Sequence, residues 1–564
     1  MIRRRVLFRC DGGALPEIGT GHVVRCLALA RDLAEVAGTR VAFCMREGAQ
    51  ADRVRAAGFP VLAIREGEDA ARRLREAADE HGADVVCLDD LGASAALVPA
   101  LRADGRIVVA IDDPAGGAGA DLSWTAAFPG RGARFEGLDR TILPGAVRRP
   151  GATRAVLASF GGHDPGDCAA RFLRAWVEAA PEAECVVAVG AGHPGLDALR
   201  GLADRAPRAR VVVDADLVEL LPHCALAVTN GGTTMLLCAA FGVPTLAVAQ
   251  YEHQLEMAQR LEATGAARAR GRAAEANFDA LVREARELLA DAPARRRMSE
   301  DGRAALPGLG RRDAVQALTV VEALPWDSNF FGREIATLHP RVLTPAILGL
   351  ARERCAAAGV ECLYVLCDAR DAASLELARR EALLEVDDRL TYAMRTRDRA
   401  PVEELPGVRV RPGRPADASA LAAIAGVAYG ASRYFHDPNF PTERCRQFYR
   451  DWILRSLEGR FDDVVLVAEV DGEPAGYVSC RALTANLGSI GLVGLAEAYR
   501  GRGLARRLLG AALEWFAAHD LPVVEVVTQG RNAPARRLYE SSGFALRRHE
   551  VWFHEWFASA TPAR

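Results

Sequence analysis

A histidine follows two closely spaced glycines near the N-terminus. The segment Gly19-Thr20-Gly21-His22 comes after an apolar run at residues 6–9 and precedes a stretch with leucines at helical spacing. Glycines between a strand and a helix let backbone N–H groups approach an anion at the helix N-terminus. The positive end of the helix dipole disfavours an imidazolium, which keeps the ring neutral and able to accept a proton. The pattern predicts a general base beside a phosphate site; a histidine that only caps or packs is the alternative.

Two further glycine turns follow later apolar runs, each before a stretch typical of a helix. They contain, in order, Gly161 and Gly162, and then Gly232, Thr233 and Thr234. Three such turns at the carboxyl ends of parallel strands favour a phosphate-bearing ligand in a cleft between two lobes. Each turn alone also fits an ordinary tight connection.

A third kind of loop lies near the C-terminus. The run Arg500-Gly501-Arg502-Gly503-Leu504-Ala505 stands between an expected strand at 489–493 and an expected helix at 504–518. Consecutive backbone amides at such a turn, with the helix dipole behind them, suit a pyrophosphate. A surface Arg-Gly turn is the alternative.

The elements that must position these residues form two patterns. Up to about residue 318, short β-branched runs alternate with Ala-, Leu- and Arg-rich stretches, which is typical of parallel sheets with crossover helices. Two clusters of five strands are expected, at 6–9, 41–44, 61–64, 85–89 and 107–112, and at 155–159, 185–189, 211–213, 226–229 and 245–249. They predict two Rossmann-type lobes, at residues 1–148 and 149–318, with a second break at 292–312.

The remaining sequence changes character. A small mixed segment at 319–400 precedes a unit at 401–564, in which Asp471-Gly472 joins two expected strands at 464–470 and 475–479. An Asp-Gly pair between such runs is a strong hairpin signal. Four domains follow from these boundaries.

The composition excludes several classes of function. The 564 residues carry a net charge of -3, which favours neither a nucleic acid nor an anionic membrane as partner. No lysine occurs, so a Schiff-base lysine and a P-loop lysine are both excluded. The thirteen cysteines are scattered singly, which favours neither disulfides nor a metal site. No signal peptide precedes the first strand, and glycines interrupt the uncharged run at 224–251, so we expect a cytoplasmic protein without a membrane span.

The N-terminal half resembles a known family. Its motifs Arg9-x-Asp11, Gly19-Thr-Gly-His22-Val-Val-Arg25, Ser159-Phe-Gly-Gly, Gly232-Thr-Thr and Gln254 are similar to those of the UDP-2,4-diacetamido-2,4,6-trideoxy-β-L-altropyranose hydrolases of pseudaminic acid biosynthesis, GT-B relatives of the MurG glycosyltransferases. The resemblance, over residues 3 to 290, implies that His22 activates water against the anomeric carbon without a metal. It places Asp11 with His22 in catalysis. Residues expected to bind the nucleotide sugar are Gly19, Gly21, Arg25, Gly161, Gly162, Gly232, Thr233, Thr234 and Gln254.

Three positions depart from that family. Leu237 stands where a ribose-gripping glutamate is usual, Asp89-Asp90-Leu91 replaces Asp-Ser-Tyr, and His253 replaces an asparagine. Leucine cannot accept hydrogen bonds from ribose hydroxyls. Either the nucleotide is held differently or the activity of this half has drifted.

The C-terminal half resembles the GNAT acetyltransferases over residues 408 to 557. The resemblance implies an acetyl-CoA site formed by Val493, Arg500, Gly501, Arg502, Gly503, Leu504, Ala505 and Asn532, with Tyr539 protonating the departing thiolate. A core role for Tyr539 is the alternative. The segments at 324–331 and 432–438, the latter with Arg433 as a substrate-binding residue, are similar to dTDP-fucosamine acetyltransferases, which carry such an N-terminal extension.

Together these resemblances predict an α/β chain: a GT-B-like pair of Rossmann-type lobes followed by a GNAT-fold acetyltransferase with a small N-terminal extension. The expected function is bifunctional. The C-terminal half N-acetylates a 4-amino-6-deoxy nucleotide sugar, and the N-terminal half hydrolyses the product from its nucleotide diphosphate. Two alternatives remain for the N-terminal half, a non-catalytic nucleotide-sugar binding module and a glycosyltransferase. The nucleotide base, the sugar stereochemistry, the oligomeric state and the general base of acetyl transfer stay open.

Overall fold

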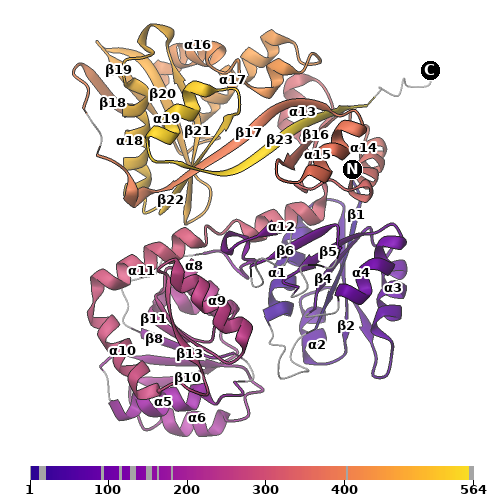
Figure 1. Ribbon diagram of the computed structural model, residues 1–564, viewed down its shortest axis with the longest axis vertical. Coiled ribbons are helices and arrows are strands. Elements are labelled where there is room, and N and C mark those ends of the chain that lie inside the picture. The colour runs from indigo at the N-terminus through magenta and orange to yellow at the C-terminus, as the bar shows by residue number, and fades with distance from the viewer. Residues whose placement is uncertain are drawn as a thin grey trace. The chain divides into compact units, whose positions relative to one another are not determined.

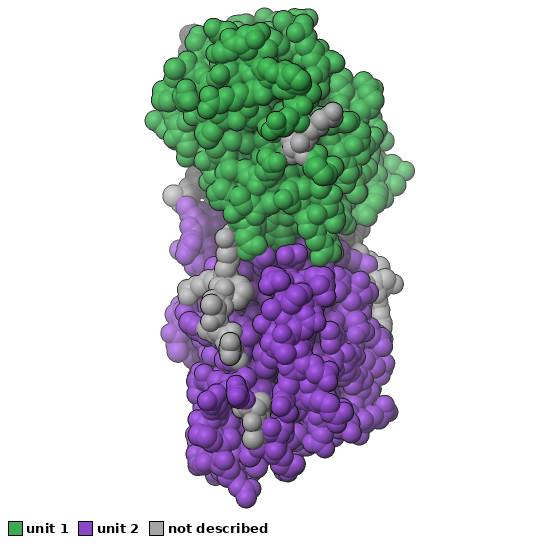
Figure 2. All heavy atoms as spheres, turned by 90° about the vertical axis from the view of Figure 1, so that its left-hand side faces the viewer, with its two compact units in different colours: residues 1–2, 319–564 green, residues 3–318 purple. Residues whose placement is uncertain are grey.

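The computed structural model divides the chain into two compact units (Figure 2). We call residues 3–318 the N-terminal unit and residues 319–564 the C-terminal unit. Every structural statement below concerns the described residues, which are 2–11, 21–90, 94–113, 117, 119–126, 135–147, 155–161, 164–179, 182–401 and 404–557. Within these ranges no helix has the length and apolar character needed to cross a membrane.

The first lobe of the N-terminal unit is a seven-stranded parallel sheet (Figure 1). Its order is β3-β2-β1-β4-β5-β6-β7, with a switch of direction between β1 and β4. The strands are β1 (Arg4–Cys10), β2 (Thr39–Arg46), β3 (Val61–Ile64), β4 (Val85–Asp89), β5 (Ile107–Ile111), β6 (Leu122–Thr125) and β7 (Phe135–Glu136). The connecting helices are α1 (Gly21–Glu35), α2 (Ala49–Ala56), α3 (Ala70–His81), α4 (Ser94–Ala103) and the short η1 (Leu138–Arg140).

The second lobe repeats this order in a six-stranded sheet, β10-β9-β8-β11-β12-β13. The strands are β8 (Ala155–Ser159), β9 (Cys185–Val189), β10 (Ala209–Val213), β11 (Cys224–Thr229), β12 (Thr245–Ala249) and β13 (Ala267–Arg272). The helices are α5 (Cys168–Ala179), α6 (Leu196–Ala203), α7 (Leu217–Leu220), α8 (Thr233–Ala240), α9 (Glu252–Ala263), α10 (Phe278–Ala290), α11 (Ala292–Ala305) and α12 (Gly310–Thr319). On β8, Val156 and Ala158 face one hydrophobic core and Leu157 faces the other, so both faces are covered, as parallel sheets require.

The C-terminal unit is built on one ten-stranded mixed sheet, β14-β15-β16-β23-β17-β22-β21-β20-β19-β18. Figure 1 shows the long antiparallel pair β17 and β23 that joins its two halves. The strands are β14 (Val321–Ala323), β15 (Ile335–Leu338), β16 (Cys362–Asp368), β17 (Leu384–Arg395), β18 (Val408–Pro412), β19 (Val464–Val470), β20 (Glu473–Ala482), β21 (Leu487–Leu495), β22 (Val523–Gln529) and β23 (Ala545–Trp556). The helices are α13 (Pro325–Phe331), α14 (Pro345–Ala358), α15 (Ala372–Arg380), α16 (Ala418–Ala428), η5 (Arg433–His436), α17 (Thr442–Leu457), α18 (Leu504–Ala518) and α19 (Ala533–Ser541).

The expected fold class is confirmed: two Rossmann-type lobes with parallel sheets precede a unit built on one mixed sheet. All ten strands expected in the N-terminal unit are present, and β6, β7 and β13 join them. The stretch at 292–312, expected as a break, is instead largely helical, and Gly302 of α11 approaches the backbone of Ala239 in α8. Strands from 319–400 and 401–564 share one sheet. The division into four domains stays a prediction.

Candidate active sites

Two neighbouring parallel strands separate in the C-terminal unit. β21 and β22 pair only from Leu487 opposite Val523 to Ile490 opposite Val526, although both strands continue beyond this point. The diverging ends line a cavity of about 1160 Å³. Past Ile490, no strand of the described residues pairs with the edge of β21 that faced β22. An unpaired strand edge suits an extended ligand.

The expected pyrophosphate loop stands at one end of this cavity. Gly501 and Gly503 have φ values of 75° and 83°, a region that L-residues rarely adopt, and Gly503 directly precedes α18. Arg500, Gly501, Ala505 and Val493 line the cavity. The remaining residues assigned to this loop do not line the cavity. Arg502 stacks over Tyr499, Gly503 precedes α18, and Leu504, the first residue of that helix, is buried.

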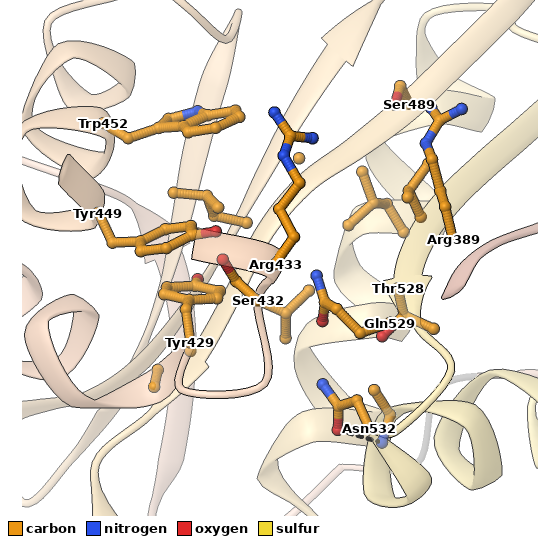
Figure 3. A pocket seen from close by; sticks show the side chains of 18 of the residues that line it. Arg389, Tyr429, Ser432, Arg433, Tyr449, Trp452, Ser489, Thr528, Gln529 and Asn532 are labelled. Carbon is orange, nitrogen blue, oxygen red and sulfur yellow. Dashed lines mark hydrogen bonds between the residues drawn. The ribbon is translucent and has the colours of Figure 1, made fainter. Parts of the chain in front are cut away.

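Asn532, just before α19, and Tyr539, on that helix, lie on the other wall. The Asn532 side-chain oxygen accepts a hydrogen bond from the Ala535 amide at 3.2 Å, which leaves its NH₂ group as the available donor (Figure 3). Burial raises the pKa of the Tyr539 hydroxyl, so the group stays protonated at neutral pH. Tyr539 is part of the hydrophobic core of the unit and also lines the cavity. Its position therefore fits both a core aromatic residue and a proton donor in the cavity.

The opposite arm of the same cavity is aromatic. Tyr429 and Tyr449 stack with ring centroids 4.4 Å apart, and Tyr449 and Trp452 are nearly parallel at 6.2 Å (Figure 3). Trp326, from the segment before the GNAT-like part, packs against Phe448 at 4.4 Å and also lines this arm. Flat rings in this arrangement suit the apolar faces of a sugar or a base.

Arg433 projects into this arm from η5 (Figure 3). Its guanidinium lies over the rings of Tyr364 and Trp552 at 4.5 and 4.1 Å and donates to the Tyr434 hydroxyl at 2.9 Å. Its Nε atom is buried and has no hydrogen-bond partner among the described residues. Burial lowers the pKa of this guanidinium, but the surrounding tyrosines and Asp327 outweigh it, so the arginine stays charged. A fixed cation of this kind suits an anionic group of a substrate.

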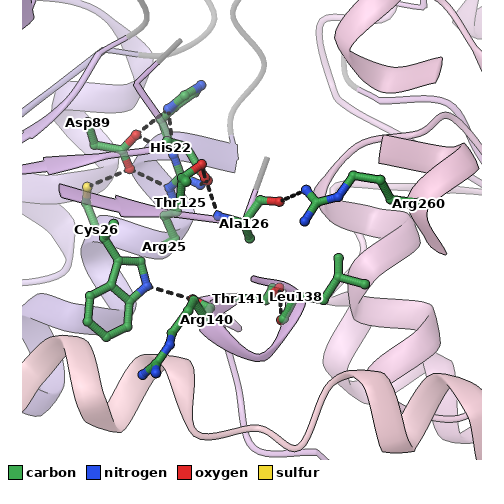
Figure 4. Close-up of polar contacts among 12 residues, drawn as sticks. His22, Arg25, Cys26, Asp89, Thr125, Ala126, Leu138, Arg140, Thr141 and Arg260 are labelled. Carbon is green, nitrogen blue, oxygen red and sulfur yellow. Dashed lines mark hydrogen bonds and ion pairs between the residues drawn. The ribbon is translucent and has the colours of Figure 1, made fainter. Parts of the chain in front are cut away.

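In the N-terminal unit, His22 is the second residue of α1 and meets the carboxyl end of β4. Its Nδ1 lies 2.5 Å from Asp89 Oδ1 (Figure 4). The same carboxylate accepts two hydrogen bonds from Arg25, whose Nη1 also pairs with Asp112. Burial opposes ionisation of Asp89, but Arg25 and His22 outweigh it and hold its pKa well below the usual range. A fixed carboxylate at Nδ1 orients the ring and leaves Nε2 to accept a proton.

A cavity of about 110 Å³ joins both lobes of this unit at His22. From the second lobe it is lined by Gly232, Thr233, Leu236 and His253, and Arg260 of α9 donates to the Ala126 carbonyl of the first lobe at 2.7 Å (Figure 4). A Cβ added at Gly21 would stand 3.3 Å from Thr233 Oγ1, so the two glycine turns approach closely. Both turns stand at the switch points of their sheets, where α/β folds bind ligands.

Other expected residues of this unit lie elsewhere. Asp11 pairs with Arg9 at 2.8 Å and accepts from the Arg46 amide, so its hydrogen bonds among the described residues go to the arginines, and its catalytic role stays a prediction. Gln254 accepts from the Gln250 amide, and neither it nor Thr234 lines the cavity. Gly161 follows β8 with φ 89°, next to the Asn230 side chain. Gly19 and Gly162 lie outside the described residues.

Sequence reasoning missed several partners. In the sequence, Asp89 stands out only because its segment departs from the related hydrolase family. Its place at the end of the strand that pairs with β1 is the signal that indicates a contact with His22. Gly231 was not selected, yet a Cβ there would come within 2.0 Å of the Gln254 carbonyl. Leu237, at the usual glutamate position, is buried in the core, whereas its neighbour Leu236 lines the cavity.

Replacing Asp89 with alanine should destabilise the N-terminal unit by about 3–5 kcal/mol, because Arg25 then keeps a buried charge with Asp112 as its remaining partner. Because the pKa of Asp89 is lower in the folded than in the unfolded chain, its stabilisation is present above the unfolded value of about 3.9. It is lost as the pH falls through the folded value. Urea unfolding measures both effects. Asp197→Ala, at a fully exposed side chain, is the control, and equal midpoints for the two variants would contradict this account.

Comparisons with known proteins place the C-terminal unit. The model of the acetyltransferase (GNAT) family matches residues 431–544. The dTDP-fucosamine acetyltransferase of Escherichia coli O6:H1 is 27% identical over 240 residues, 42% of this chain and 97% of that protein. An uncharacterized N-acetyltransferase of Archaeoglobus fulgidus is 31% identical over 143 residues, 24% of this chain and 93% of that protein.

Two other comparisons each cover a little over half of the chain. The spore coat polysaccharide biosynthesis protein SpsG of Bacillus subtilis is 24% identical over 322 residues, 53% of this chain and 93% of that protein. The crystal structure of Acinetobacter baumannii MurG aligns with a TM-score of 0.42 and 17% identity, over 56% of this chain and 99% of that one. The chain covers almost the whole of the Archaeoglobus fulgidus N-acetyltransferase, and the family model matches the same kind of protein. The chain therefore belongs, through its C-terminal unit, to the GNAT acetyltransferases, whose cofactor is acetyl-CoA.

Proposed function

We propose that the C-terminal cavity N-acetylates the amino group of a 4-amino-6-deoxy sugar nucleotide. The N-terminal unit then hydrolyses the product to a free acetamido sugar and a nucleoside diphosphate. The observation that carries the first step is the continuity of one cavity from the pyrophosphate loop to the aromatic arm with Arg433. The relative named dTDP-fucosamine acetyltransferase, covered over 97% of its length, supports an amino sugar nucleotide as acceptor.

The residues of this cavity fit acetyl-CoA. The glycine loop and the start of α18 supply backbone donors for a pyrophosphate, and the free edge of β21 runs from that loop into the cavity. Bound there, acetyl-CoA supplies an acetyl group on a thioester. The NH₂ group of Asn532 faces the same space, where an extended pantetheine arm needs donors.

Tyr539 is the proposed proton donor to the departing sulfur. Its hydroxyl is buried and protonated, and Tyr539 lines the same cavity as Asn532 and Tyr429. The acceptor amine must be unprotonated to attack, because its lone pair forms the new C–N bond. Arg433 is assigned to binding an anionic part of the acceptor.

For the N-terminal unit, the oriented His22 supports hydrolysis. Asp89 fixes Nδ1, and the cavity before the ring is lined by both lobes at their switch points. A water held there would give its proton to Nε2 while backbone amides of the Gly232 turn stabilise the departing diphosphate. The name of the SpsG relative, a polysaccharide biosynthesis protein, supports a sugar substrate.

One observation favours a second candidate, a non-catalytic nucleotide-sugar binding module. Leu237 is buried in the core, so this position offers the ribose no carboxylate. A binding module would keep affinity for the nucleotide sugar and release no nucleotide. The two candidates therefore differ in one measurable product.

Thiol release from acetyl-CoA, assayed against a panel of UDP- and TDP-linked 4-amino sugars, tests the acetylation. We expect at least one member of the panel to give stoichiometric thiol and acetamido sugar nucleotide. A purified chain that binds acetyl-CoA but acetylates none of them would overturn the assigned substrate class.

Replacing Gly501 with valine should weaken acetyl-CoA binding by about tenfold, since a residue with a Cβ at φ 75° costs about 1–2 kcal/mol and moves the loop amides. Calorimetric titration of acetyl-CoA measures the effect. Gly359→Val is the matched control: Gly359 has φ 69° and open space around its Cβ position, and it ends α14 outside the cavity lining. Equal losses of affinity in both variants would contradict the assignment of the loop.

A further inference from the structure

The acceptor arm contains three carboxylates whose surroundings differ. Among the described residues that line the cavity these are Asp327, Asp387 and Asp462. Asp462 accepts a hydrogen bond from Ser456 at 2.6 Å, and Asp327 accepts one from the Tyr434 hydroxyl at 3.1 Å. The Oδ1 atom of Asp387 is buried and accepts no hydrogen bond from the described residues.

A β-bulge places Asp387 on the wall of the cavity. On β17, Glu385 lies opposite Phe553 of β23 and Asp387 lies opposite the next residue, Trp552, so Val386 is an extra residue in the ladder. Because side chains alternate between the faces of a strand, one extra residue redirects those that follow it. The facing strand β21, with the sequence LGSIGLVGL, offers the cavity no titratable side chain.

The charged and titratable groups around Asp387 come from the loop after β22, from η5, from β17 itself and from α17. Arg531 Nε lies 3.4 Å from Oδ1, and Arg433 approaches from η5. Asp388 is the adjacent carboxylate on β17, and the Tyr449 hydroxyl on α17 is within electrostatic range. Burial raises the pKa of Asp387 to about 7, against the opposing effect of Arg531. A carboxyl group with this value exchanges protons readily at neutral pH.

Asp387 and Tyr539 line one cavity together with two stacked tyrosines. The rings of Tyr429 and Tyr449 stack 4.4 Å apart in that cavity. Asp387 and the proposed acid therefore share the volume that contains the aromatic surface on which a sugar would rest.

We propose that Asp387 is the general base that deprotonates the ammonium group of the acceptor sugar, an inference that rests on the proposed acetylation. The N–H bond breaks, its electron pair stays on nitrogen, and the proton moves to the Asp387 carboxylate. The nitrogen lone pair then forms the C–N bond as the C–S bond breaks, and the sulfur takes its proton from Tyr539. A second N–H proton restores the tyrosine hydroxyl, so one proton per turnover leaves through Asp387 to solvent.

The variant Asp387→Asn tests this role, with Asp471→Asn as the control. Asp471 is exposed in the turn between β19 and β20 and does not line the cavity. We expect Asp387→Asn to lower kcat about 10²- to 10⁴-fold at pH 7, with affinity for acetyl-CoA changed less than about twofold. The control should keep its kcat within about twofold of the wild type.

The pH profile separates a base from a structural role. In the wild type, kcat/KM should rise with pH through about 7. In Asp387→Asn the inflection near pH 7 should be absent, and kcat/KM should rise instead until the amine loses its own proton. Asp387→Glu should recover part of the wild-type kcat/KM and its rise with pH near 7.

A measurement on the protein without cofactor completes the test. Calorimetric titration with the accepted amino sugar nucleotide, in buffers of different ionisation enthalpy, reports proton exchange on binding, which Asp387→Asn should alter. If Asp387→Asn is active, keeps the rise of kcat/KM near pH 7 and exchanges as many protons on binding as the wild type, the base assignment alone is overturned. A wild-type chain inactive on every 4-amino sugar nucleotide would instead overturn the proposed function, and the base assignment with it.

Discussion

His22→Gln is expected to reduce the release of nucleoside diphosphate from an acetamido sugar nucleotide by about 10³-fold. Glutamine fills similar space at the start of α1 but cannot take a proton from water. Asp89, which now fixes the Nδ1 side of the ring at 2.5 Å, keeps its hydrogen bonds to Arg25 in the variant. The loss therefore falls on chemistry rather than on folding, and nucleoside diphosphate should still bind. Chromatography of the nucleotide products over time measures the rate.

The control for this variant is His223→Gln, at an exposed histidine outside the cavity. It should hydrolyse at the wild-type rate. Acetylation by the C-terminal unit should be unchanged in both variants. Full hydrolysis by His22→Gln, or a wild-type chain that binds the sugar nucleotide without releasing nucleotide, would favour the binding module.

Tyr539→Phe is expected to lower kcat for acetyl transfer about 10²- to 10³-fold. The variant removes one buried hydroxyl and keeps the ring that packs against Tyr392 and Phe544, so the core should hold. Without a proton donor, the sulfur must leave as a bare thiolate. Thiol release at saturating concentrations of both substrates measures kcat, and calorimetry should give an unchanged affinity for acetyl-CoA.

Tyr392→Phe is the matched control for this second variant. Its ring contacts that of Tyr539 at a centroid distance of 6.0 Å, but its hydroxyl donates to Glu540 and does not line the cavity. It should keep most of the wild-type rate. If both variants are equally active, the proton must reach the sulfur by another route.

Local patterns in the sequence predicted most of the fold. Buried parallel strands read as apolar runs, and glycines mark the turns after β1, β8 and β11, so both Rossmann-type lobes could be predicted. β13, with the sequence ARARGR, has no β-branched or large apolar residue, and it forms a strand by pairing with β12. The residues at 292–312 contain Arg, Gly and Pro but still form helices, because α11 packs against α8.

The candidate sites were predicted unevenly for the same reason. The loop at 500–505 is a local pattern, so the sequence alone could indicate it. Asp89 meets His22 only through the pairing of β1 with β4, and Asp387 faces the cavity only because of the bulge on β17. Contacts set by strand order and register leave no spacing signal in a single sequence.

The most direct test is a time course with the intact chain, acetyl-CoA and the accepted 4-amino sugar nucleotide. The account predicts that thiol and acetamido sugar nucleotide appear first, and that free acetamido sugar and nucleoside diphosphate follow. Without acetyl-CoA, nucleoside diphosphate should be released from the amino sugar nucleotide slowly or not at all. Release of nucleotide without prior acetylation, or acetylation of no sugar nucleotide at all, would contradict it.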